Sequence, residues 1–106
     1  MDATRLSYLS QLYDLYHPLL TDKKRSIADA TFTRDLSLSE IAEALKISRS
    51  AVQDHLQKSI AKLEELEASL GFLALLNQQE SLLNALEKTS LSDAQKALIK
   101  QLKEVI

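Results

Sequence analysis

Side chains that can hydrogen-bond to nucleic-acid bases recur in one short stretch of the sequence, between residues 46 and 58. An arginine can pair with guanine and a glutamine with adenine, while an aspartate can accept a hydrogen bond from cytosine although it repels phosphate. The alternative is that the same residues form only the solvated face of a helix. The candidates for binding nucleic acid or another partner are Lys46, Ser48, Arg49, Ser50, Gln53, Asp54, Gln57 and Lys58.

A secondary basic patch is the run Lys23-Lys24-Arg25. These residues can contact phosphates or an acidic partner, or they can be the solvated start of a helix. Lys62 is a further residue that can hold a phosphate backbone. The formal net charge is −2, however, and a dedicated DNA-binding domain usually carries a basic excess that neutralises phosphates. The charge therefore argues against a simple transcription factor.

Residues suited to metal binding or covalent catalysis are scarce. The chain has no cysteine, which excludes disulfides, thiolate metal sites and a cysteine nucleophile. His17 and His55 are the two histidines, and neither has a second histidine or a carboxylate at a convincing ligand spacing. No residues are indicated as the nucleophile and the orienting partner that a histidine-based site needs. We expect no metal, no cofactor, no small-molecule substrate and no enzymatic activity.

The segment from Leu38 to Gln57 has the pattern of a helix-turn-helix, which would present the base-binding candidates. The run 37–40 (Ser-Leu-Ser-Glu) fits a capping box that starts a short helix over 38–45, and Ser48 fits the N-cap of a long helix over 49–70. The turn usually uses glycine where this chain has Lys46, so Lys46 has to adopt a positive φ or a modified turn. The residues expected to hold the crossing are Ile41, Ala42, Leu45, Ile47, Val52 and Leu56.

The rest of the chain also predicts helices, so the expected fold class is all-α. Good helix formers dominate, and one Gly and one Pro leave few turn residues for sheets. We expect a helix-turn-helix domain over 1–70, with a long recognition helix that Gly71 can stop in a left-handed conformation. A C-terminal helical hairpin over 71–106 would follow as a possible dimerisation arm. The remaining helices are predicted over 4–16, 22–34, 72–87 and 94–105.

An apolar seam in the long predicted helix indicates self-association. Its residues are spaced as in a coiled coil, which favours pairing with residues 72–87 or with a second copy of the chain. We expect a homodimer, and the alternative is burial of the same face within one chain. The seam consists of Leu56, Ile60, Leu63 and Leu70.

Three tyrosines in the first predicted helix, Tyr8, Tyr13 and Tyr16, are spaced to form part of the core. The alternative is a platform on which bases stack.

No targeting or membrane segment is indicated. The N-terminal residues are polar and mixed in charge, unlike a secretory signal. The longest apolar run, 71–76, is far shorter than a membrane span. We expect a cytoplasmic protein.

Four stretches resemble the YlxM family of small bacterial helix-turn-helix proteins. They are Tyr8-Leu-Ser-Gln-Leu-Tyr-Asp-Leu-Tyr16, Leu19-Leu-Thr-Asp-Lys-Lys-Arg25, Asp35-Leu-Ser-Leu-Ser-Glu-Ile-Ala-Glu43 and Ile47-Ser-Arg-Ser-Ala-Val-Gln-Asp54. The helix-turn-helix itself also resembles region four of sigma factors and the LuxR-type domains. The resemblance covers roughly the first 70 residues, up to Gly71.

The YlxM family is associated with the signal recognition particle pathway, and its genes commonly neighbour that of the particle's GTPase, Ffh. The resemblance therefore implies a non-enzymatic regulator that contacts Ffh, its receptor or its RNA, and it supplies no residue-level site. An alternative is a dimeric transcriptional regulator that binds DNA through residues 49–57. A third hypothesis is a protein-interaction module that binds no nucleic acid.

Overall fold

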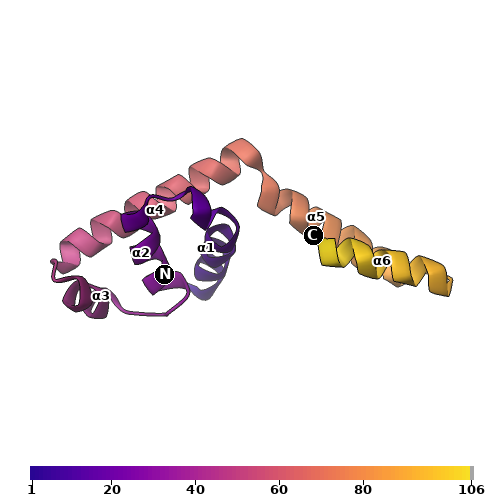
Figure 1. Cartoon of the computed structure of the whole chain (residues 1–106), viewed down its shortest axis with the longest axis horizontal. Coiled ribbons are helices and arrows are strands. Elements are labelled where there is room, and N and C mark those ends of the chain that lie inside the picture. The colour runs from indigo at the N-terminus through magenta and orange to yellow at the C-terminus, as the bar shows by residue number, and fades with distance from the viewer. Residues whose placement is uncertain (106) are drawn as a thin grey trace. The chain divides into compact units, whose positions relative to one another are not determined.

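The computed structural model describes residues 1–105, and every regular element in that range is a helix (Figure 1). Two compact units are formed, Met1–Leu70 and Gly71–Ile106. The predicted all-α class and the helix-turn-helix are confirmed. The elements are α1 (Ala3–Tyr16), the 3-10 turn η1 (His17–Leu19), α2 (Asp22–Phe32), α3 (Leu38–Leu45), α4 (Arg49–Leu70), α5 (Phe72–Glu87) and α6 (Asp93–Val105).

The predicted caps separate α3 from α4. The Ser37 hydroxyl accepts the Glu40 N–H and the Glu40 carboxylate accepts the Ser37 N–H, each at 3.1 Å, which completes the capping box. Lys46 ends α3 in the left-handed conformation, with φ 56°. The Ser48 hydroxyl then accepts the Ala51 N–H at 3.0 Å and starts α4. Only the three residues 46–48 therefore separate the end of α3 from the start of α4.

Most residues expected at the crossing are covered, but Leu45 is not. Ile41, Ala42, Val52 and Leu56 are buried and Ile47 is half-buried. Leu45 is 42% exposed, so the prediction that it faces inward is wrong. It is the last residue of α3 and lies at the edge of the crossing, where the chain already turns toward α4.

The core of the first unit forms where α4 packs against α1, α2 and α3. Leu56, Ile60 and Leu63 of the predicted seam are buried within this single chain, whereas Leu70 is 44% exposed. The expected pairing of that seam with residues 72–87 or with a second copy is therefore wrong for its three buried members. The helices that pack against α4 belong to the same unit, and their buried residues include Leu9, Leu12, Ile27 and Ala28.

Two of the three tyrosines belong to this core. Tyr13 and Tyr16 are buried, and their hydroxyls donate to Asp29 Oδ1 at 3.1 Å and to Glu67 Oε1 at 2.6 Å. Tyr8 is 39% exposed. The rings of Tyr13 and Tyr16 are thus occupied by packing, which leaves no three-tyrosine platform for bases.

The second unit is a helical hairpin. Gly71 has φ 66° and separates α4 from α5, as its position in the sequence predicts. Ser92 and Gln95 form reciprocal caps at the start of α6, with distances of 2.9 and 3.2 Å. Lys103 joins the two helices through an ion pair to Glu87 at 2.8 Å.

None of the helices within residues 1–105 has the length and apolar character to cross a membrane.

Candidate nucleic-acid interface

The first turns of α4 present one exposed polar surface. Val52 and Leu56, which form the neighbouring stripe of the helix, are buried in the core. The exposed side chains line a shallow hollow of about 720 Å³ together with Leu38 from the start of α3. We call this surface the α4 flank, and it consists of Arg49, Ser50, Gln53, Asp54 and Gln57.

The charges around the α4 flank are partly neutralised by one another. Asp54 pairs with Lys58 one turn later at 3.0 Å, so this carboxylate is offset by a cation on its own helix. Lys46 and Arg49 are exposed and form no ion pair within residues 1–105. Their charges remain available to an anionic ligand.

Ser48 differs from its neighbours because its hydroxyl is already used. It caps α4 by accepting the Ala51 N–H. Ser48 was predicted to lie in the interface, and its role in the structure is to fix where α4 begins.

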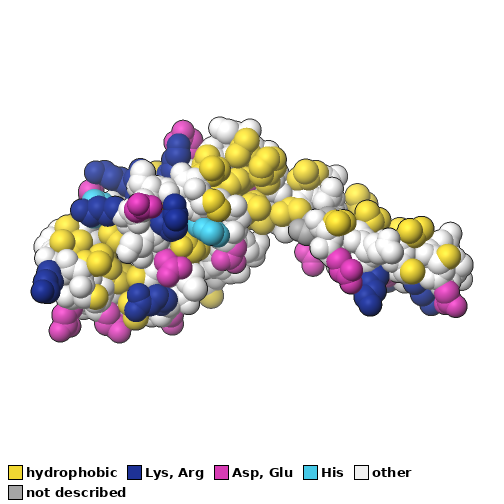
Figure 2. Space-filling view, in the orientation of Figure 1, with side chains coloured by type: hydrophobic (Ala, Val, Ile, Leu, Met, Phe, Trp, Pro, Cys, Tyr) yellow, Lys and Arg dark blue, Asp and Glu magenta, His cyan; other side chains and the backbone are white. Residues whose placement is uncertain are grey.

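The structure brings two parts of the secondary basic patch next to α4. The buried Ser59 hydroxyl donates to the backbone oxygen of Lys24 at 3.3 Å and to that of His55 at 2.9 Å. This contact places the first turn of α2 beside the middle of α4, which carries Lys58 and Lys62. Figure 2 shows Lys and Arg side chains gathering over α2 and α4. We call Lys23, Lys24, Lys58 and Lys62 the lysine strip.

Arg25, the third residue of the basic run, is engaged within its own unit. Its guanidinium donates to the Leu20 carbonyl at 3.1 Å and lies 3.7 Å from the Asp22 carboxylate. The run predicted as one patch is thus divided between the exposed Lys23, the half-buried Lys24 and an arginine that joins α2 to the preceding turn.

Sequence reasoning did not find the link between the basic run and α4. Ser59 lies within the apolar stripe of α4, between Leu56 and Leu63. A small polar residue in such a stripe is a signal of close helix approach, because its hydroxyl can bond to a backbone carbonyl. Leu38 was likewise not expected in the hollow, since its place there depends on how α3 crosses α4.

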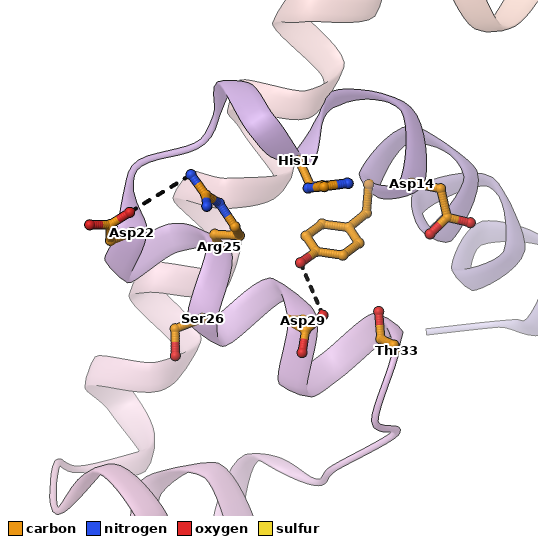
Figure 3. A pocket seen from close by; sticks show the side chains of 8 residues that line it. Asp14, His17, Asp22, Arg25, Ser26, Asp29 and Thr33 are labelled. Carbon is orange, nitrogen blue, oxygen red and sulfur yellow. Dashed lines mark hydrogen bonds and ion pairs between the residues drawn. The ribbon is translucent and has the colours of Figure 1, made fainter.

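A second hollow of about 590 Å³ lies between α1, η1 and α2 (Figure 3). Burial, with the hydrogen bond to Asp29 and that carboxylate's charge, raises the pKa of Tyr13 to about 12. Tyr13 therefore stays protonated at neutral pH and donates to Asp29. The His17 ring lies 5.4 Å from the Tyr13 ring.

Within residues 1–105 no group of three His, Asp or Glu side chains is placed to hold a metal ion.

Comparison with known proteins extends the resemblance over nearly the whole chain. The model of the family described as "Putative helix-turn-helix protein, YlxM / p13 like" (UPF0122) matches residues 3–105. The expectation that the resemblance stops near Gly71 was therefore too narrow, and the hairpin belongs to the matched region.

Curated bacterial relatives agree with this match. A UPF0122 protein of Shouchella clausii is 42% identical over 94 residues, covering 88% of this chain and 84% of the relative. One from Symbiobacterium thermophilum is 39% identical over 94 residues, covering 85% and 88%. One from Listeria innocua is 35% identical over 102 residues, covering 92% and 93%. This chain belongs to the YlxM / p13-like family of helix-turn-helix proteins, UPF0122.

Proposed function

We propose that this protein is a cytoplasmic, non-enzymatic regulator that binds duplex DNA through the α4 flank. The observation that carries the proposal is the exposure of this flank on the second helix of a helix-turn-helix, a helix that Val52 and Leu56 hold in the core. In the usual docking mode of this motif, the second helix enters the major groove and its N-terminal residues contact base edges.

The residue types in and around the flank suggest that some side chains contact bases and others contact phosphates. Arg49 can pair with guanine and Gln53 with adenine, while Lys46 and the lysine strip contact phosphates on either side. Phosphate contacts set orientation and affinity, whereas base contacts set sequence preference. The Asp54–Lys58 pair reduces phosphate attraction near the bases, so the flank depends more on base contacts than on charge.

The first experiment measures binding to duplex DNA across a salt series, using sites enriched from a random library. We expect Arg49→Ala and Gln53→Ala to weaken binding by about 1–3 kcal/mol each and to relax the preference at one base position. Lys23→Ala should weaken binding to all DNA sequences equally. It should also lower the slope of the logarithm of affinity against the logarithm of salt concentration by about one. Matched controls are Gln11→Ala in α1 and Lys100→Ala in α6, which change exposed residues outside the flank. Equal losses in the flank variants and the controls would contradict the proposal.

A second candidate is a role in the signal recognition particle pathway, with Ffh, its receptor or its RNA as the partner. The resemblance to the YlxM family supports it. The net charge of −2 also favours it, because binding to DNA phosphates is weak without a basic excess. An A-form RNA helix has a major groove too narrow for α4, so RNA would contact the lysine strip rather than the α4 flank.

The two candidates give different results in one binding panel of duplex DNA, the particle's RNA, Ffh and its receptor. Binding to Ffh that survives high salt and the Arg49→Ala and Gln53→Ala changes, with no DNA binding, would favour the pathway role and reject the DNA reader. No binding to the RNA, Ffh or the receptor would reject the pathway role.

A further inference from the structure

The α5–α6 hairpin leaves an apolar stripe uncovered on each of its helices. Leu75, Leu82 and Leu86 of α5 are 49%, 63% and 43% exposed. Leu98, Leu102 and Val105 of α6 are 59%, 48% and 81% exposed. Monomeric proteins rarely expose a continuous apolar surface built from so many large side chains, and such surfaces usually mark a binding interface.

Both stripes turn toward the same face of the hairpin. The side of each helix that contacts the other includes Glu87 of α5 and Lys103 of α6. At 3.6 residues per turn, the apolar stripe lies about a third of a turn around the helix axis from this contacting side. The helices of a hairpin are antiparallel, so these rotations bring the two stripes to one side. Figure 2 shows hydrophobic side chains along the upper side of the hairpin and charged side chains along its lower side.

This geometry is that of one layer of a four-helix bundle. Helices in such bundles present apolar residues at spacings of three and four toward a second pair of helices. Leu98, Leu102 and Val105 follow this spacing, whereas Leu75, Leu82 and Leu86 are seven and four residues apart. The hairpin is also too small to be stable by itself, since domains below about 40 residues usually need a further source of stability. A second helical layer would supply the missing half of the core.

We propose that the second layer is the hairpin of a second copy of this chain, which makes the protein a two-fold symmetric dimer. Residues 71–106 contain four Lys and four Asp or Glu, so two copies meet without net repulsion. The residues beside the apolar stripes include the uncharged Gln78 and Gln101, so the face selects no strongly charged partner. An isologous interface needs this kind of self-complementary surface.

The proposal is tested by the mass of the full-length protein in sedimentation equilibrium across a concentration series. We expect twice the chain mass of 11.9 kDa for the unchanged protein. Leu82→Glu and Leu98→Glu should each weaken self-association by roughly a hundredfold, because a charge is forced into the centre of the interface. Both variants should then sediment as monomers at micromolar concentration.

The chain offers an adjacent control for each variant. Ser81 and Ala97 are exposed and lie on the other face of the same helices, so Ser81→Glu and Ala97→Glu add the same charge without touching the stripes. Both controls should remain dimers. Cooperative thermal unfolding of the Met1–Leu70 unit, followed by circular dichroism, verifies that each variant is folded.

Two results would overturn the proposal. One is an unchanged protein that remains a monomer throughout the concentration series. The other is a dimer that survives Leu82→Glu and Leu98→Glu combined, or that is lost equally in the Ser81→Glu and Ala97→Glu controls. Neither result depends on DNA or on any pathway component, so the dimer and the proposed function can fail separately.

Discussion

Lys46 has an unusual backbone conformation for a residue with a side chain. Its φ of 56° lies in the left-handed region, which costs L-residues about 1–2 kcal/mol and glycine almost nothing. The conformation allows the Ile47 N–H to donate to the Ala42 carbonyl at 3.1 Å, which closes the end of α3. A lysine here places an exposed cation beside Arg49, at the start of the α4 flank.

At this residue, stability and binding should respond in opposite directions. We expect Lys46→Gly to raise the free energy of unfolding by about 0.5–1 kcal/mol, because glycine adopts the left-handed conformation without strain. The same change should weaken DNA binding by removing a phosphate contact. Urea denaturation measures the first effect and a binding titration the second. Ala44→Gly, inside α3, is the control and should lose about 0.5–1 kcal/mol of stability. A loss of stability in Lys46→Gly would contradict the left-handed assignment.

At the scale of the elements, local signals determine where helices start. The capping box at Ser37, the N-cap at Ser48 and the helix stop at Gly71 are visible in the sequence, and they predict where α3 and α4 begin and where α4 gives way to α5. The end of α2 does not, because Phe32 is followed by a turn in which the Leu36 N–H donates to the Ala30 carbonyl at 2.9 Å. The predicted helix over 22–34 is therefore two residues too long.

The candidate site likewise contains features that the local sequence predicts and features that depend on contacts between distant segments. Helical spacing places Arg49, Gln53 and Gln57 along one stripe of α4 that lies beside the stripe of Val52 and Leu56. Spacing alone therefore does not show that the first three residues are exposed. The lysine strip could not be predicted, since it depends on the contact between Ser59 and the Lys24 backbone, 35 residues apart in the sequence. Leu45 was wrongly predicted to face inward for a related reason. Helical spacing gives the direction of a side chain, but it does not show whether a neighbouring helix extends far enough to cover it.

The capping box of α3 should give the protein a recognisable pH dependence. Hydrogen bonds from the Ser37 backbone and hydroxyl lower the pKa of Glu40 below its ordinary value of 4.5. A lowered folded-state pKa contributes stability above the unfolded value, and this contribution is lost as the pH falls through the folded pKa. We expect Glu40→Gln to unfold more easily than the unchanged protein at pH 7.

The difference between Glu40→Gln and the unchanged protein should shrink as the pH falls below about 4.5. Urea denaturation at pH 7, 5 and 3 measures it. Glu43→Gln, in the same helix but outside the capping box, is the control and should not show this pattern. A difference for Glu40→Gln that stays constant from pH 7 to pH 3 would show that the carboxylate does not support the cap.

At the scale of the whole molecule, charge is distributed unevenly between the two units. Residues 1–70 contain nine Lys or Arg and eleven Asp or Glu, whereas residues 71–106 contain four of each. Within the first unit, Lys58 and Lys62 of the lysine strip pair with Asp54 at 3.0 Å and with Glu65 at 3.8 Å. The least compensated positive charge that a nucleic acid would meet is therefore that of Lys46 and Arg49. A dimer through the hairpin would present two such surfaces, which suits two half-sites related by a two-fold axis.

Separating the units should reveal different sources of stability. The fragment Met1–Leu70 contains the buried residues Leu9, Leu12, Ile27, Ile41, Val52 and Leu63, so we expect it to unfold cooperatively as a monomer and to bind a single DNA half-site. The fragment 71–106 buries few of its own apolar side chains, and its helix content should rise with concentration because folding is coupled to self-association. Circular dichroism across a dilution series measures both fragments. Helicity of 71–106 that is independent of concentration would show that the hairpin is stable alone, and a non-cooperative Met1–Leu70 would show that the core needs residues beyond α4.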